Sequence, residues 1–118
     1  MAPDARVHLP LKPVDLELLL ALAGEDRHGY GLVQAIAAHT DGLVVLDPGN
    51  LYRVIKRLLE DGLVAEAGQR RADDTGGERR RYYTLTSLGG RVLAAELERL
   101  RALVTAPDTR ALARRLPS

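Results

Sequence analysis

Residues 48–62, PGNLYRVIKRLLEDG, constrain the fold most because both ends and both faces of this segment can be assigned. Asp47 can cap a helix, Pro48 suits its first position, and Gly62 can take the left-handed conformation that ends it. The apolar residues follow the i, i+3, i+4, i+7, i+8 spacing of one helical stripe: Leu51, Val54, Ile55, Leu58 and Leu59. The sequence therefore predicts a bounded helix with one buried face. The other face carries Asn50, Arg53, Lys56 and Arg57.

Two further helices are expected before this one. Residues 13–24 are dense in Leu and Ala and end at Gly24, which predicts a helix buried on much of its circumference. Residues 28–40 predict a second helix, and residues 25–29 are expected to form the turn before it. The inward side chains of this second helix would be Leu32, Val33, Ile36 and Ala37. Residues 1–12 show no periodicity and are expected to form a loose N-terminal arm.

After Gly62 the hydrophobic pattern changes from helical to extended. Residues 63–68 are short and partly alternating, residues 69–78 are polar and contain glycine, and residues 79–86 alternate again. This pattern predicts a β-hairpin with a long charged tip. Tyr83 is expected to lie in the core, and Tyr82 on a face of the hairpin.

A last helix is expected after the hairpin, with Thr86 as its cap. Its apolar residues step by 4, 3 and 4 positions, as in the seam of a coiled coil, and predict a dimer interface of Leu93, Leu97, Leu100 and Val104. Pro107 interrupts the helix, and both a further short helix and a frayed tail remain open beyond it. The chain thus divides into an arm (1–12), a domain of helices and hairpin (13–85), a dimerisation helix (86–106) and a C-terminal tail or short helix (107–118).

Three helices followed by a hairpin predict an α+β, mainly α, winged helix-turn-helix, in which the third helix enters the DNA major groove and the hairpin is the wing. The polar face of residues 48–60 would then read DNA. The alternative is a solvated face on which Arg53 and Arg57 pair with Glu60 or Asp61. Similarly, Tyr30 can contact a DNA phosphate through its hydroxyl, or it can serve only in packing within the protein. The candidate DNA-contacting residues are Tyr30, Gln34, Gly49, Asn50, Tyr52, Arg53, Lys56, Arg57, Arg79 and Arg80.

The wing carries both signs of charge. Arg79 and Arg80 are better placed for phosphate contact than Arg70 and Arg71. Part of the positive charge is offset by Asp73, Asp74 and Glu78. The alternative for this segment is therefore a hydrated loop.

Composition narrows the function further. A chain of 118 residues corresponds to one domain, the absence of cysteine excludes disulfides and thiol catalysis, and no apolar run approaches the ~20 residues of a membrane span. His8, His28 and His39 show no metal-ligand spacing, and no serine lies in a nucleophile turn. We therefore expect a cytoplasmic protein that is not an enzyme and has no cofactor, metal or membrane partner.

Three segments in register resemble a known family: LLLALAGEDRHGYGL (18–32), PGNLYRVIKRLLEDGLV (48–64) and RRRYYTLTSLGGRVL (79–93). They resemble PadR-type transcriptional regulators, in particular the short subgroup with a single C-terminal dimerisation helix. The resemblance implies a homodimeric winged-helix protein, usually a repressor, whose last helix contacts the partner and the partner's first helix. It places residues 28–30 near the DNA backbone and residues 48–52 at the start of the recognition helix.

This chain departs from the family at two positions of that helix. Asn50 stands where Thr is usual, and Arg53 stands where Pro or a small residue is usual. Since Asn and Arg suit adenine and guanine edges respectively, these departures predict a different operator. Short members of the family can bind flat aromatic or phenolic compounds between the subunits, but a chain without Trp or Phe offers less for stacking.

Together these observations predict a sequence-specific transcriptional regulator, most simply a ligand- or stress-responsive repressor that binds a palindromic operator as a homodimer. Its partners would be double-stranded DNA, a second copy of itself and a small-molecule effector between the subunits. The alternative from another functional class is a winged-helix module that binds protein and has no specific affinity for DNA.

Overall fold

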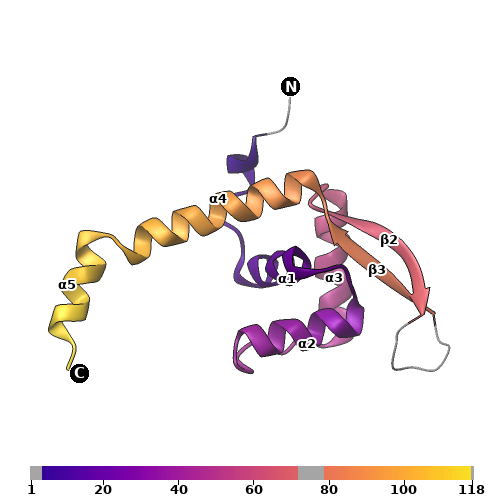
Figure 1. Cartoon of the computed structure of the whole chain (residues 1–118), viewed down its shortest axis with the longest axis horizontal. Helices are drawn as coiled ribbons and strands as arrows, with labels where there is room; N and C mark the ends of the chain where they lie inside the picture. The colour runs from indigo at the N-terminus through magenta and orange to yellow at the C-terminus, as the bar shows by residue number, and fades with distance from the viewer. Residues whose placement is uncertain (1–3, 72–78, 118) are drawn as a thin grey trace.

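The computed structural model describes residues 4–71 and 79–117 of the chain. Three helices form its body: α1 (Pro13–Gly24), α2 (Gly29–His39) and α3 (Pro48–Glu60). A hairpin of β2 (Val64–Arg71) and β3 (Arg79–Leu85) projects on one side, and α4 (Ser87–Val104) runs away from the body on the other (Figure 1). The predicted winged helix-turn-helix is confirmed in its order and in its mainly helical character.

The helix boundaries depend on short-range capping that the sequence reveals. The Asp47 carboxylate accepts a hydrogen bond from the Asn50 backbone N–H at 2.9 Å, with Pro48 in the first turn. Gly62 ends the helical segment at φ +75°. Thr86 caps α4 by accepting from the Gly89 N–H at 2.9 Å. These three assignments agree with the sequence.

The sheet has one strand more than the sequence predicts. The expected turn at residues 25–29 contains β1 (Arg27–His28), which pairs antiparallel with β3 so that the strand order is β1-β3-β2. Two residues are too few to show a period, so this strand can be recognised only through its partner. The hairpin itself is bent by an irregularity between Glu66 and Gln69, where Gly68 has φ +89°. The predicted tip charges Asp73, Asp74 and Glu78 lie outside the described residues.

The core joins all three body helices to the hairpin and to the first half of α4. On α3, Leu51, Ile55 and Leu58 are at most 2% exposed, while the stripe positions Val54 and Leu59 lie at the edge of the core. On α2 the buried residues include Leu32, Ala35 and Ile36, whereas Val33 and Ala37 are only partly covered. Tyr83 is 4% exposed, as its predicted core position requires.

The predicted loose arm is fixed over its described part, which corrects the expectation from sequence. Residues Ala5–His8 form the 3-10 helix η1, which packs against α4. The Leu11 N–H donates to Glu96 Oε2 at 2.7 Å, and Glu96 is 1% exposed. The anchor lies 85 residues away in sequence, so no local pattern could reveal it. At the other end, α5 (Pro107–Arg115) decides the choice left open for the tail in favour of a short helix.

Candidate nucleic-acid interface

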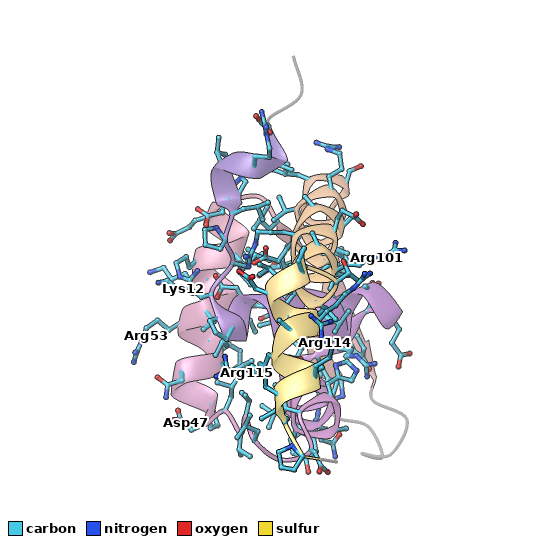
Figure 2. All side chains as sticks on the ribbon, turned by 90° about the vertical axis from the view of Figure 1, so that its left-hand side faces the viewer. Lys12, Asp47, Arg53, Arg101, Arg114 and Arg115 are labelled. Atoms are coloured by element: carbon cyan, nitrogen blue, oxygen red, sulfur yellow. The ribbon has the colours of Figure 1, made fainter. Side chains whose placement is uncertain are left out.

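The exposed face of α3 lies opposite its buried stripe. Gly49, Tyr52, Arg53 and Lys56 are all exposed, and helical spacing directs Arg53 and Lys56 most nearly away from the core. Figure 2 shows Arg53 extending from α3 away from the rest of the molecule. These two cations therefore lie on the face that α3 presents outward, together with the exposed Glu60 at the end of the helix.

Asn50 is exposed but not free to rotate, because Asp47 holds its side chain. Its Nδ2 donates to Asp47 Oδ2 at 2.7 Å, beside the capping hydrogen bond from its backbone N–H. A carboxylate only accepts hydrogen bonds, so the amide must turn its NH₂ group to Asp47 and leave Oδ1 as the outward acceptor. Oδ1 matches base donors, the N6 amino group of adenine and the N4 amino group of cytosine.

Arg57 has a different role from the one expected from its position on the polar face. It lies on the flank of α3 toward α1, where Nη1 and Nη2 donate to the two carboxylate oxygens of Asp15 at 2.6 and 2.8 Å. Asp15 is 5% exposed, and its hydrogen bond to Arg57 raises the pKa of the guanidinium. This two-pronged pair fixes α3 against α1, so we remove Arg57 from the candidate DNA-contacting residues.

The N-terminus of α2 and strand β3 continue the surface beside α3. Tyr30 is 58% exposed and Gln34 is also exposed. The guanidinium carbon of Arg80 lies 5.7 Å from the centre of the Tyr30 ring, within cation–π range, and Arg80 Nη1 lies 3.5 Å from His28 Nδ1. The predicted wing residue Arg80 is thus brought to the predicted α2 residue Tyr30. Arg79 begins β3, but its side chain lies outside the described part of the chain.

His28 has a structural task that the sequence did not predict. Its Nδ1 accepts a hydrogen bond from the Gly31 N–H at 3.0 Å and so caps α2. Its ring also meets the Tyr82 ring edge-on, with centroids 5.2 Å apart. In the sequence, His28 directly precedes the glycine-rich start of α2, which is the position of an N-terminal cap. His is not among the preferred capping residues, so the sequence indicates this role only weakly.

An apolar hollow opens between α2 and α3 and was not predicted. It has a volume of about 290 Å³ and is lined by Gly29, Tyr30, Val33, Leu46, Pro48, Leu51 and Tyr52. Gly29 packs closely against the wall formed by Tyr52, because a Cβ on Gly29 would lie 3.0 Å from the Tyr52 hydroxyl. The hollow lies beside Arg80, whose guanidinium is over the ring of the lining residue Tyr30.

The predicted dimer seam divides into a buried and an exposed part. Leu93 is 4% exposed and belongs to the core of its own protomer, which leaves its side chain little surface for a second chain. Leu97 is 40% exposed, Leu100 is half-buried and Val104 is 68% exposed. An apolar face that could meet a second chain therefore begins only at Leu97.

In residues 4–71 and 79–117, no helix has the length and apolar character needed to cross a membrane. Over the same residues, no three His, Cys, Asp or Glu side chains gather in a way that could hold a metal ion.

Three helices, an antiparallel wing and an exposed cationic third helix define the winged-helix class. The sequence model of the transcriptional regulator PadR-like family matches residues 18–95, and the chain belongs to this family. The resemblance found in the sequence is thereby confirmed. Members of the family are transcription regulators, which also bears out the prediction that the chain is not an enzyme.

Similar proteins come from several bacteria. An uncharacterized protein of Lysinibacillus sphaericus is 36% identical over 76 residues, which cover 64% of this chain and 67% of that protein. A transcriptional regulator of Clostridium thermocellum is 26% identical with a TM-score of 0.64, over 81% of this chain and 90% of that one. A PadR family regulator of Clostridium difficile is 22% identical with a TM-score of 0.68, over 85% and 99%.

A structure of Bacillus subtilis PadR in complex with operator DNA shares the fold at 17% identity and a TM-score of 0.61. The match covers 73% of this chain and 47% of that one.

Proposed function

We propose that this protein represses transcription in the cytoplasm by binding an inverted-repeat operator as a homodimer. The observation that carries the proposal is the outward pair Arg53 and Lys56 on α3, continued by Tyr30 and Arg80 on the neighbouring elements. Over the described residues, the side chains of Arg53 and Lys56 make no hydrogen bond or ion pair with the rest of the fold, so holding the fold does not account for them. The operator complex of Bacillus subtilis PadR, a protein of the same fold, supports this assignment.

Each side chain has a role set by its chemistry. Arg53 would donate two hydrogen bonds to a guanine, Asn50 Oδ1 would accept from adenine or cytosine, and Lys56 would contact phosphate. Tyr30 and Gln34 at the start of α2 would contact the sugar–phosphate backbone, with Arg80 and Arg79 on the flanking phosphates. Tyr52 lies at the edge of this contact, and Gly49 adds no side chain that would keep the groove away.

The homodimer would form through apolar residues of α4, namely the exposed Leu97, Leu103 and Val104 and the half-buried Leu100. Two copies of α3 would then enter successive major grooves about 34 Å apart. A small molecule or stress signal acting between the subunits would change this spacing and lower the affinity for the operator.

The test is selection of random duplex DNA by the purified protein, followed by affinity measurements against salt concentration. The proposal predicts an enriched inverted repeat bound with nanomolar affinity. Retention without enrichment, at the ~10⁻⁴–10⁻⁶ M expected for non-specific binding, would instead favour a winged-helix module for protein partners.

Three variants separate base reading from charge. Arg53→Ala should lose about 1–3 kcal/mol of discrimination at particular base pairs, whereas Lys56→Ala should weaken operator and random DNA equally and reduce the salt slope. Arg6→Ala is the control, because Arg6 lies on η1 with its side chain 84% exposed. Equal losses on operator and random DNA for Arg53→Ala would show that Arg53 does not read a base.

A further inference from the structure

The hollow between α2 and α3 lies within the surface that the proposed function assigns to DNA. Tyr52 forms one wall and is followed on α3 by Arg53, and Tyr30 forms the other wall and carries Arg80 over its ring. Both tyrosines are more than half exposed, at 54% and 58%. Arg80 thus lies beside one wall of the hollow, and Arg53 projects from the outward face of the helix that forms the other wall.

These surroundings identify the kind of occupant. A polyanion bound by Arg53 and Arg80 would cover the hollow. The hollow is lined by Val33, Leu46, Pro48 and Leu51, whose side chains cannot form the hydrogen bonds that a buried polar group would lose with water. The major groove displays one apolar substituent, the C5-methyl group of thymine. The volume of about 290 Å³ also leaves room for the ring edge that carries this methyl.

We propose that the hollow formed by Tyr30, Val33, Leu46 and Tyr52 receives the methyl group of a thymine in each operator half-site. This inference rests on the proposed function and adds a second type of base readout to it, through apolar contact rather than hydrogen bonding. Val33 and Leu46 are both partly exposed in the free protein, so burial of the methyl also removes apolar protein surface from water.

The experiment replaces each thymine of the selected operator, one position at a time, by deoxyuridine. This change removes the methyl group and keeps base pairing. Affinity is measured by fluorescence polarisation at constant salt. At one position per half-site the loss should be about fourfold, the value for one buried methyl, and about fifteenfold when both half-sites are changed. At that position a cytosine should bind more tightly when it carries a 5-methyl group.

Protein variants connect the effect to the hollow. Val33→Thr keeps the side-chain shape but makes it polar, so the thymine-to-uracil affinity ratio should fall toward one while affinity for the uracil operator is kept. The matched control is Val45→Thr, which makes the same change at a neighbouring residue that is 70% exposed and outside the hollow. Leu46→Ala provides a second lining variant, with folding of all variants checked by circular dichroism.

Four results would overturn the inference. A tightly bound operator that is insensitive to uracil at every thymine would refute methyl recognition and leave the proposed function intact. An unchanged thymine-to-uracil ratio in Val33→Thr and Leu46→Ala would place the methyl elsewhere. Methyl NMR signals of Val33 and Leu46 that shift with indole but not with operator would assign the hollow to a small apolar molecule. Absence of any sequence-selective binding would instead overturn the proposed function and this inference together.

Discussion

Replacing Gly89 by alanine puts a methyl group where the first turn of α4 meets the start of β2. A Cβ at this position would lie 2.0 Å from the Leu63 carbonyl oxygen and 2.9 Å from Leu85 Cδ1. The Leu63 oxygen also accepts the Thr86 N–H at 3.2 Å, so it belongs to the junction between hairpin and helix. Because the obstacle is backbone, no rotation of a side chain can relieve the contact.

The magnitude follows from this distance. An ordinary carbon–oxygen contact is about 3.3 Å, so the helix must move by about 1.3 Å relative to β2. Overpacking of this kind costs about 1–3 kcal/mol and more where backbone must shift, and loss of the Thr86 hydrogen bond adds about 1 kcal/mol. The higher helix propensity of alanine returns up to about 1 kcal/mol. We expect Gly89→Ala to lower the free energy of unfolding by about 2–4 kcal/mol.

The neighbouring glycine provides the control. A Cβ on Gly90 would meet Leu85 Cδ2 at an unstrained 3.9 Å, so Gly90→Ala should stabilise the protein by about 0.5–1 kcal/mol through helix propensity alone. Urea unfolding followed by circular dichroism, at fixed protein concentration, measures the free energy of unfolding of both variants. Stabilities for the two variants that agree within 0.5 kcal/mol would refute the argument that Gly89 is required by close packing.

The remaining predictions concern charge pairs and assembly. Arg57→Ala should lower the free energy of unfolding by about 2–3 kcal/mol because it leaves the 5% exposed Asp15 carboxylate unpaired. Asp15→Ala should lower it by less, because the Arg57 side chain is 38% exposed and water can solvate it. Urea unfolding of both variants decides the order. Hydrogen bonds from Arg99 and from the Leu11 N–H lower the pKa of Glu96 below its ordinary value of 4.5. The ionised Glu96 carboxylate therefore contributes its full share to the stability of the fold above that pH, and this contribution is lost on acidification. The melting temperature of Glu96→Gln should therefore fall less between pH 5 and pH 3 than that of the wild type. Leu97→Asp with Leu100→Asp should be monomeric at micromolar concentration by light scattering, and a dimeric double variant would contradict the proposed role of α4.

Local sequence patterns predicted most of the helical architecture. The capping residue Asp47, the stop at Gly62 and the stripe of α3 act over a few neighbouring residues, so their physical effect is visible in the sequence itself. The same holds for the cap of α4 by Thr86. The alternation of β3 likewise predicted the buried position of Tyr83.

The candidate interface could be predicted only in part. Helical spacing selected Arg53 and Lys56, whose exposure in the structure agrees with a reading face. The same spacing could not distinguish Arg57, because its partner Asp15 lies 42 residues earlier on another helix. Leu93 shows the same difficulty for the seam of α4, since periodicity identifies an apolar stripe but not the chain against which it packs.

The sequence by itself determined where the helices begin and end, which faces are apolar, and that a β-hairpin follows the third helix, because these properties depend on backbone preferences and on hydrophobic period. Tertiary structure alone decided which residues from distant segments of the chain meet. It joined Leu11 to Glu96, brought Arg80 to Tyr30, and set Gly29 against Tyr52 to shape the hollow. Such contacts depend on distances between segments far apart in the chain, and these distances exist only after the core has packed.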